Sequence, residues 1–533
     1  MYPYSDGHIG LIRSLSALMR RRARLYWRGA GARGFLWAAV LSLMLVPALA
    51  EPLLVIEGIE SWQVFPRQGK VGAISFHARG EGTLAAELFR IGEPTPLMRR
   101  EWPITNRESQ PLALPDVPVG GEYTLRFKLG DQVVEFRHIL LGEIWLVGGQ
   151  SNAVGVPHKP EQPLPAVHYF RDNHWREGAD PLFSPIFPLP PGETYVAAWR
   201  RAAQRYHEQT GIPVGLMGWA FGGVPMSRFW DAEIKEMPDF KPLVTEHGRG
   251  ATTYLWYQGE ADANLQGLPL YRERLAAMAS TIRRYAANPE MVMVVVQLSF
   301  RHEPSGMEAP HYGRLCEQQR QFCTEDPRAV LIPAMPYPHL DVVHLTFDGY
   351  MGLGNRIGEC LADINRTGKI AWQGPRLLSA KFADAARRKI RVTFDSAIPL
   401  KLLNEPPGAG ADGKGHRPEM DWFVTDDQHQ GYAELLAAKI ESGRVLLDVA
   451  GATIDAAATQ LGAKAIRAPL LRTGYLQVQR VLVDESSVVL ELVEPAQRGA
   501  KVSYGLMTGS LSTLVDKHGL AAAVFADVPV TGP

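Results

Sequence analysis

Cysteine is scarce in this chain, which has only three among its 533 residues. So few cysteines exclude a disulfide scaffold, and no spacing of Cys and His is typical of a zinc site. Cys316 and Cys323 are seven residues apart in a segment with a helical pattern. Seven residues of helix rise about 10.5 Å, which is too far for a disulfide to span. We therefore expect these two cysteines to be unpaired, buried apolar residues.

An excess of either charge is also missing. The chain has 56 Lys and Arg against 56 Asp and Glu, so its formal net charge is zero. A protein that binds nucleic acid or an anionic membrane surface usually carries a basic excess. The composition therefore predicts no nucleic-acid partner. A hydrophobic content of 46% with 21% charged residues is that of an ordinary globular protein.

Long apolar runs are missing beyond residue 50. The run at residues 35–46 follows an arginine-rich segment and precedes Pro47-Ala48-Leu49-Ala50. A basic segment, a short apolar core and an Ala-x-Ala site form a signal peptide, whereas this run is short for a membrane-spanning helix. We predict a signal peptide over residues 1–50, with a retained anchor as the alternative and Met19 as an alternative start. The mature chain is then expected to be secreted or periplasmic, without stable membrane association.

No internal repeat or low-complexity segment marks the rest of the chain. At 533 residues it is too long for a single hydrophobic core. Residues 51–141 alternate apolar and polar positions between turn residues, which predicts a β domain of sandwich or jelly-roll type. Residues 371–533 return to short strand patterns and predict a C-terminal β-rich domain.

Residues 142–370 alternate apolar strand candidates with amphipathic helix candidates. Continuous apolar strands joined by helices indicate an α/β fold, with a parallel sheet covered on both faces. In such sheets the functional site lies at the carboxyl ends of the strands. We expect strands at 144–147, 214–220, 252–257, 291–299 and 329–335, and helices at 194–210, 270–287, 312–325 and 350–361.

Candidate catalytic residues follow the first and last of these strands. Ser151 lies in Gly148-Gly149-Gln150-Ser151-Asn152. A serine on a sharp turn between a strand and a helix is typical of a hydrolase nucleophile, although a plain turn has the same composition. A serine hydroxyl needs a base, and an imidazole needs a carboxylate that fixes its tautomer. Asp341-Val342-Val343-His344 supplies both groups. The alternatives are a plain surface loop and Asp348 as the orienting carboxylate.

Donors for an oxyanion also follow strand ends. Ester cleavage needs N–H groups around the developing negative charge, each worth roughly 2.7–4 kcal/mol. We expect three donors: the Ser151 amide, a backbone amide of Gly222 or Gly223, and the side-chain amide of Gln258. A plain glycine turn and a satisfied polar residue are the alternatives at these positions.

Four ordered blocks resemble sialate O-acetylesterases and related carbohydrate acetylesterases of the SGNH-hydrolase superfamily. The similar segments are Gly142–Asn152, Phe221–Pro225, Trp256–Ala263, and Asp341–Thr346 followed by Gly354–Gly358. The resemblance implies a three-layer αβα, flavodoxin-like domain with a parallel sheet, flanked by β-sandwich-like domains. It implies that Ser151 is the nucleophile, His344 the base and Asp341 its partner.

The same resemblance assigns roles around this triad. It places Gln258 and one glycine of Gly222-Gly223 in the oxyanion hole with the Ser151 amide. We expect Asn152 to be a positioning residue. Glu260 is expected to brace the loop of Gln258, with a surface acid as the alternative.

The chain departs from the family pattern at three positions. Ala153 follows Ser-Asn, Phe221 precedes Gly-Gly and Val224 follows it. These positions line the pocket in the family and do no chemistry. The departures therefore leave the substrate open and the reaction unchanged.

We therefore expect a serine hydrolase that removes O-acetyl groups from a carbohydrate, through an acetyl-serine intermediate and without metal or cofactor. The alternatives are a non-catalytic glycan-binding protein on an esterase-like core, and a short-chain lipase-like esterase. Trp199 and Trp230 are expected to be exposed aromatics, which favour sugars weakly. Neither the identity of the acetylated glycan nor the oligomeric state follows from the sequence.

Overall fold

The structure is a computed structural model that describes most of the chain after the predicted signal peptide. It describes residues 54–532 except 106–107, 184–187, 231–239, 265–266, 300–308, 371–373, 397–398, 404–417, 432–437, 442–443, 450–451, 456–473 and 507–512. The predicted signal peptide at 1–50 therefore lies outside the described residues. Among the helices that are described, none has the length and apolar character needed to cross a membrane.

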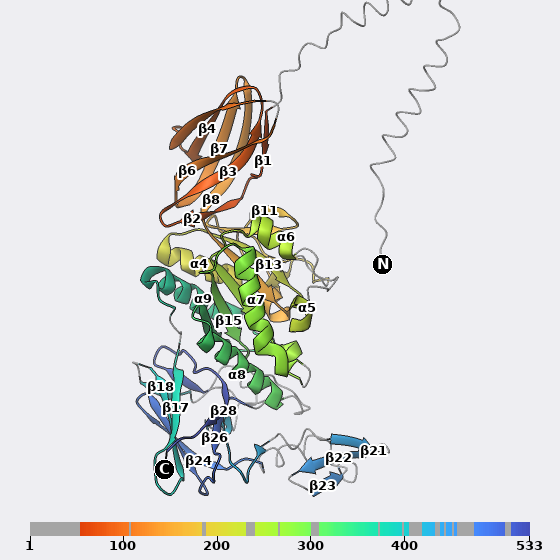
Figure 1. Cartoon of the computed structure of the whole chain (residues 1–533), viewed down its shortest axis with the longest axis vertical. Helices are drawn as coiled ribbons and strands as arrows, with labels where there is room; N and C mark the ends of the chain where they lie inside the picture. The colour runs from red at the N-terminus through yellow and green to blue at the C-terminus, as the bar shows by residue number, and fades with distance from the viewer. Residues whose placement is uncertain are drawn as a thin grey trace, which may run out of the picture.

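The N-terminal part is built from strands, as the alternating pattern predicted (Figure 1). Along β3, exposed and buried residues alternate strictly, so that one face carries Ile74 and Phe76 into a core. The strands before β8 are β1 (Val55–Glu57), β2 (Val64–Gln68), β3 (Val71–Arg79), β4 (Gly82–Arg90), β5 (Met98–Ile104), β6 (Gln110–Pro118) and β7 (Gly120–Leu129).

Strand β8 (Gln132–Gly149) joins this β part to the central part without a break. Its first half pairs antiparallel with β7, and its second half pairs in parallel with β13 and β14. The boundary expected between residues 141 and 142 falls inside this strand. Every residue from Leu140 to Gly149 is buried, so Ser151 follows a strand that is held along its whole second half.

The central sheet is parallel, with strand order β16-β15-β14-β8-β13-β10. Strand β11 adds to β10 in the antiparallel direction. The expected strands of this region are present, whereas β10 was not anticipated. The bounds are β10 (Val167–Arg171), β11 (His174–Glu177), β13 (Val214–Ala220), β14 (Thr253–Tyr257), β15 (Val292–Gln297) and β16 (Ala329–Pro333).

Helices lie against both faces of this sheet. On one face, Trp145 meets Tyr206 of α4 edge-on, with ring centroids 5.1 Å apart. Leu146, the next residue of β8, points to the opposite face. Its neighbour across the strands is Tyr254, whose hydroxyl lies 4.0 Å from the Met278 sulfur of α7. Helix α4 therefore covers one face, and α7 covers the other.

Each covering helix has a partner, and Figure 1 shows the two pairs beside the sheet. Helix α9 packs on α4 through Gly354 and Gly358, where an added Cβ would come within 2.5 Å of the α4 backbone. Helix α8 packs beside α7. The bounds are α3 (Ser151–Val154), α4 (Ala198–Thr210), α5 (Met226–Trp230), α6 (Phe240–Pro242), α7 (Tyr271–Tyr285), α8 (Ala309–Glu325) and α9 (Phe347–Thr367).

One helix prediction was wrong at its start. The helix expected over residues 194–210 begins at Ala198, because Thr194–Val196 form strand β12. This strand pairs antiparallel with β9 (Val156–His158). The pairing joins segments far apart in the sequence, so local periodicity does not reveal it.

The C-terminal part is rich in strands, as expected. Its core includes Ile390, Val392, Leu490 and Val502. The exposed loop that the sequence suggested near residues 404–416 lies outside the described residues. The strands are β17 (Arg376–Phe382), β18 (Lys389–Asp395), β19 (Leu400–Leu402), β20 (Trp422–Thr425), β21 (Ala438–Glu441), β22 (Arg444–Val449), β23 (Ala452–Asp455), β24 (Val478–Asp484), β25 (Ser487–Leu492), β26 (Lys501–Tyr504), β27 (Leu514–Asp516) and β28 (Phe525–Pro529).

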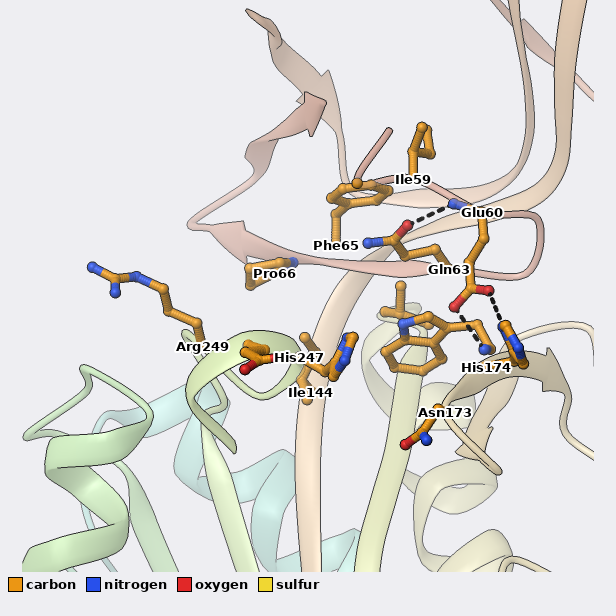
Figure 2. Close-up of a pocket in the computed structure, with 14 residues that line it drawn as sticks. Ile59, Glu60, Gln63, Phe65, Pro66, Ile144, Asn173, His174, His247 and Arg249 are labelled. Carbon is orange, nitrogen blue, oxygen red and sulfur yellow. Dashed lines mark hydrogen bonds and ion pairs between the residues drawn. The ribbon is translucent and has the colours of Figure 1, made fainter. Parts of the chain in front are cut away.

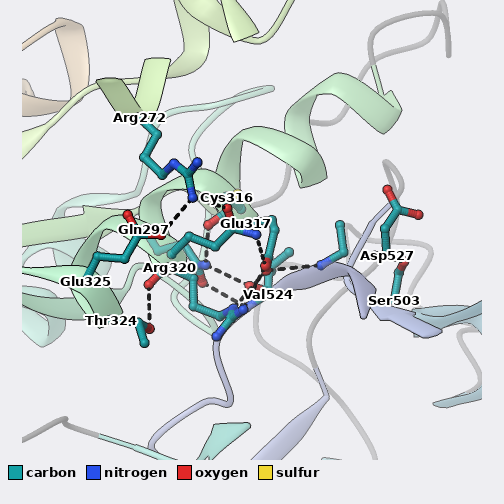
Figure 3. Close-up of polar contacts among 12 residues, drawn as sticks. Arg272, Gln297, Cys316, Glu317, Arg320, Thr324, Glu325, Ser503, Val524 and Asp527 are labelled. Carbon is teal, nitrogen blue, oxygen red and sulfur yellow. Dashed lines mark hydrogen bonds and ion pairs between the residues drawn. The ribbon is translucent and has the colours of Figure 1, made fainter. Parts of the chain in front are cut away.

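Hydrogen bonds join the C-terminal part to the central part beside β28, as Figure 3 shows. The Gln297 side chain donates to the Val524 carbonyl at 2.9 Å and accepts from the Val524 amide at 2.8 Å. The Glu317 carboxylate accepts from the Ala526 amide at 3.3 Å. Ala523 and Val524 belong to the same buried cluster as the central sheet. The end of the chain thus completes the core of the central part.

Cys316 and Cys323 are buried and do not pair with each other, as their spacing predicted. Cys316 and Cys323 lie on α8, and both are free and buried. Cys360, on α9, is also buried and forms no disulfide.

Candidate active site

Ser151 is the first residue of the short helix α3, directly beyond the end of β8. Gly149 has a φ of 148° and lies so close to β14 that an added Cβ would be 2.1 Å from the Tyr257 carbonyl oxygen. Only glycine accepts both constraints. The Gln150 amide then donates to that same carbonyl at 3.1 Å. These contacts fix the turn and leave Ser151 partly exposed beyond the sheet.

The structure brings His344 to Ser151 across 193 positions of sequence. The Nε2 atom of His344 lies 2.8 Å from the Ser151 Oγ. Its Nδ1 atom lies 2.7 Å from the Asp341 Oδ2. This is the arrangement in which a carboxylate orients an imidazole and leaves its other nitrogen for the hydroxyl.

The loop between β16 and α9 holds Asp341 by its own backbone. The second oxygen of the Asp341 carboxylate accepts from the amides of Val343 at 2.9 Å and His344 at 2.8 Å. Partial burial raises the pKa of Asp341. The hydrogen bonds from these amides and the interaction with the His344 ring lower it by more, so that the pKa lies below its usual value. The rival carboxylate, Asp348, is exposed in the first turn of α9. Asp341 is thus the carboxylate that the structure pairs with His344.

Asn152 connects three segments behind the serine. Its Nδ2 donates to Glu260 at 2.6 Å and to the Val343 carbonyl at 3.0 Å. Its Oδ1 accepts from the Tyr350 hydroxyl at 2.6 Å. The nucleophile turn, the Glu260 loop and the histidine loop therefore meet at one amide side chain.

Glu260 is buried and is not a surface acid. Burial raises the pKa of its carboxyl, and the hydrogen bond from Asn152 together with backbone amides opposes that rise. One carboxylate oxygen has no hydrogen-bond partner among the described residues. Glu260 therefore contacts the nucleophile turn through Asn152, whereas its expected role in bracing the loop of Gln258 stays a prediction.

Gly222 and Gly223 are exposed in the loop that follows β13. This loop lies beside the nucleophile turn, because the Phe221 amide donates to the Gly149 carbonyl at 3.2 Å. Gly223 has a φ of 68°, which suits glycine. Both glycine amides are thus placed on a loop next to the segment that bears Ser151.

The side-chain NH₂ group of Gln258 has the contacts of a satisfied polar residue, which was the alternative that the sequence left open at this position. Its Nε2 donates to the Val224 carbonyl at 3.2 Å and to the Asp262 Oδ2 at 2.6 Å. Two acceptors occupy both hydrogens of the amide. The expected third oxyanion donor is therefore engaged in holding the loop that contains Gly222 and Gly223.

Asp262 is the residue that sequence reasoning missed. It is buried, and its Oδ2 accepts from the Met226 amide at 2.6 Å as well as from Gln258. Burial raises the pKa of Asp262, and these two hydrogen bonds oppose the rise. The available signal was its place in Gln258-Gly259-Glu260-Ala261-Asp262, where a second acid follows the strand end.

Two other expectations concern residues around the site. Trp199 is not exposed: only 1% of it is accessible, and its Nε1 donates to the Ala153 carbonyl at 2.7 Å. The prediction was wrong because Trp199 lies on the buried face of α4, in its first turn. The Trp230 side chain lies outside the described part. In the described part of the chain, no group of His, Cys, Asp or Glu could hold a metal ion.

Two cavities lie beside the sheet, and Asn173 borders both of them. The larger, of about 430 Å³, includes Phe65, Ile144, His174 and Trp175 (Figure 2). Ile144 is near the start of the parallel part of β8, so this cavity lies away from Ser151. The smaller cavity, of about 230 Å³, includes Gly218–Phe221 at the carboxyl end of β13. It therefore lies at the same edge of the sheet as Ser151.

Comparisons with known proteins show which family and which folds the chain resembles. Residues 141–363 match the sequence profile of a family described as carbohydrate esterase, sialic acid-specific acetylesterase. No curated protein sequence matches the chain significantly. A carbohydrate acetylesterase from Xanthomonas citri is similar in structure, with 16% identity, a TM-score of 0.58 and coverage of 89% of this chain and 99% of that one. A protein from Arabidopsis thaliana has 18% identity and a TM-score of 0.35, over 41% of this chain and 96% of that one.

The family match indicates an esterase, and the central part has a mixed α/β fold. The match to the carbohydrate esterase family of sialic acid-specific acetylesterases covers residues 141–363, which is less than half of the chain. The shared fold extends beyond that region, since the Xanthomonas citri structure aligns with 89% of the chain.

Proposed function

We propose that this protein is a serine hydrolase that removes O-acetyl groups from a carbohydrate through an acetyl-serine intermediate. The observation that carries the proposal is the continuous chain of contacts from Asp341 through His344 to Ser151, at 2.7 and 2.8 Å. The family of residues 141–363 supplies the substrate class, an acetylated carbohydrate.

In the acylation step, the Ser151 Oγ attacks the acetyl carbonyl carbon. His344 Nε2 accepts the hydroxyl proton as the C–O bond forms. Asp341 holds the imidazole in the required tautomer and stabilises the imidazolium. The same proton then passes to the sugar oxygen as its bond to the acetyl carbon breaks. A deacetylated sugar leaves, and the acetyl group stays on Ser151.

Deacylation repeats these roles with water in place of the serine. His344 takes a proton from the water as it attacks the acetyl-serine, and returns it to Ser151 Oγ as acetate departs. The Ser151 amide and the amide of Gly222 or Gly223 donate to the oxyanion in both steps. Gln258 and Asp262 act on this oxyanion hole by holding the loop of the two glycines.

We assign the central part to the SGNH-hydrolase superfamily as a three-layer αβα domain. The parallel strand order and the contacts of α4 and α7 with opposite faces of the sheet support this assignment. We also propose export and signal cleavage, on the strength of the basic and apolar pattern at residues 1–50.

A non-catalytic glycan-binding protein is the less favoured alternative. A decayed core has no need to keep a serine, a histidine and an aspartate in hydrogen-bond contact, as in this site. A lipase-like esterase with the same triad differs only in the acyl chain it prefers. Turnover of acetyl against octanoyl esters of 4-nitrophenol separates that alternative.

The test is acetate release by the wild-type protein and by S151A from 4-nitrophenyl acetate and from a panel of acetylated glycans. We expect the wild type to release acetate and S151A to lose the activity at least about 1000-fold, with an unchanged circular dichroism spectrum and melting temperature. Equal turnover by the two proteins would refute the proposal.

A further inference from the structure

The cavity at the carboxyl end of β13 has no role in the chemistry described so far. It measures about 230 Å³ and is lined by Phe170, Phe183, Trp219 and Phe221, with Arg171, Asp172 and Asn173 also around it. Trp219 and Ala220 pair across the sheet with Gly148 and Gly149, which lead into Ser151. A ligand in this cavity therefore lies one strand away from the nucleophile.

The apolar lining of the cavity consists largely of aromatic rings that keep some exposure. Trp219, Phe221 and Phe183 are each partly exposed. The rings of Trp219 and Phe221 are 5.8 Å apart and inclined at 59°. Gly218 leaves room for Phe183, whose ring an added Cβ would approach to 2.7 Å. Such rings offer flat apolar faces to a ligand, as the C–H face of a sugar requires.

Trp219 also contributes a donor that lacks an acceptor. Its Nε1 is buried and has no hydrogen-bond partner among the described residues. An unpaired buried N–H group costs about 1–3 kcal/mol. A hydroxyl group of a ligand in the cavity would remove that cost, whereas a hydrocarbon chain would not.

The polar lining has no net charge. Arg171 is the cation among the described lining residues, and its Nε lies 3.4 Å from the Asp172 Oδ2. Its Nη1 already donates to the Pro181 carbonyl at 2.5 Å. The Asp172 side chain is 51% exposed, so hydroxyl groups can reach it. This lining suits a ligand with several hydroxyl groups and no carboxylate.

We propose that this cavity binds a neutral pyranose ring of the acetylated substrate, and that Trp219 and Phe221 are its specificity determinants. The proposal rests on the proposed esterase function, because it names the sugar that the same site accepts. The size of the cavity supports a single ring, since pockets for larger, drug-sized ligands begin at about 300 Å³. The neutral lining distinguishes this sugar from an acetylated sialic acid, which carries a carboxylate.

The first experiment compares W219F with the wild type on a monoacetylated methyl glucoside, 9-O-acetylated sialic acid, 4-nitrophenyl acetate and 4-nitrophenyl octanoate. We expect the wild type to prefer the neutral glucoside over the sialic acid. In W219F the ratio of kcat/KM for the glucoside to that for 4-nitrophenyl acetate falls about five- to tenfold, mainly through KM, because one hydrogen bond is lost.

The matched control is W102F, the same substitution at a half-buried tryptophan of β5 in the N-terminal part. Its ratio of kcat/KM values is expected to stay at the wild-type value. If kcat/KM of W219F falls equally for the glucoside and for 4-nitrophenyl acetate, the cavity proposal is overturned. A wild-type preference for the sialic acid over the glucoside also overturns it. A selective loss with the octanoate would mark an acyl pocket and would also overturn it.

The second experiment measures binding without turnover. Calorimetric titration of S151A with the acetylated glucoside is compared with that of the S151A/W219F double variant, and we expect a five- to tenfold weaker Kd for the latter. Equal Kd values contradict the sugar site. If the wild type hydrolyses none of the esters, the esterase function fails instead, and the two failures are thereby distinguished.

Discussion

At the scale of single residues, the site depends on one short loop that supplies both partners of the serine. Asp341 and His344 are three positions apart, and the amides of Val343 and His344 hold the carboxylate in place. The proposed base and its proposed orienting group therefore lie on the same short loop. Ser151 meets them from a different strand end, so the triad is completed by the fold and not by the loop alone.

Replacing Asp341 by Asn keeps the shape of the loop but removes the charge that stabilises the imidazolium. We expect D341N to lower kcat/KM on 4-nitrophenyl acetate by at least about 100-fold, since comparable substitutions in serine hydrolases lose about 10⁴ in kcat. Steady-state kinetics measures the loss. The matched control is D348N, which alters an exposed acid on α9 and is expected to keep full activity. A larger loss in D348N than in D341N would reassign the orienting carboxylate.

The residue roles were predictable from sequence only where the chemistry is local. Ser151, Asp341 and His344 follow strand ends and carry the groups that ester cleavage needs, and the structure brings them together. The contacts of Asp262 could not be predicted, because the Met226 amide is 36 positions away. Whether Gln258 donates to an oxyanion or to its neighbours depends on distances of a few ångströms, which the sequence does not contain.

At the scale of elements, two loops build the oxyanion hole that we propose. The loop after β13 carries Gly222 and Gly223, and the loop after β14 holds it through Gln258 and Asp262. The apolar runs made the strands themselves predictable. Strand β10 was missed, because Val167–Arg171 contains a histidine and an arginine beside its apolar residues.

Removing the Asp262 side chain should loosen the glycine loop. We expect D262A to lower kcat by about 10- to 100-fold with less than a twofold change in KM, because oxyanion donors act in the transition state. The affinity of benzeneboronic acid, which forms a tetrahedral adduct with a nucleophilic serine, should fall in parallel. Kinetics and inhibition constants provide the two measurements.

The control for D262A is N264A, which alters a neighbouring side chain that bonds within its own turn. It is expected to change kcat by less than twofold. If N264A and D262A lose the same activity, or if D262A changes KM alone, Asp262 has only a structural role.

At the scale of the whole molecule, the catalytic part is built into its neighbours. Strand β8 continues from the N-terminal strands to the nucleophile turn, and Val524 completes the central core from the far end of the chain. The sequence suggested separate domains, because the pattern changes near residue 142 from alternating strands to strands that alternate with helices. Strand β8 runs across that boundary and pairs on both sides of it.

The contact between Gln297 and Val524 tests how much the C-terminal part contributes to stability. In Q297A the amide and carbonyl of Val524 lose a buried partner, and each unpaired group costs about 1–3 kcal/mol. We expect the melting temperature to fall by about 5 °C or more, as followed by calorimetry. The matched control Q428A removes an exposed glutamine side chain and should change the melting temperature by less than about 1 °C. Equal melting temperatures for Q297A and the wild type would contradict this role.

The central claim is that Ser151 is an activated nucleophile. The most direct test treats the wild-type protein with a fluorophosphonate and measures its intact mass, followed by mapping of the modified peptide. The account predicts one adduct, on Ser151, formed quickly in the wild type and slowly in H344A. An unmodified protein, or an adduct on another residue with Ser151 untouched, would contradict it.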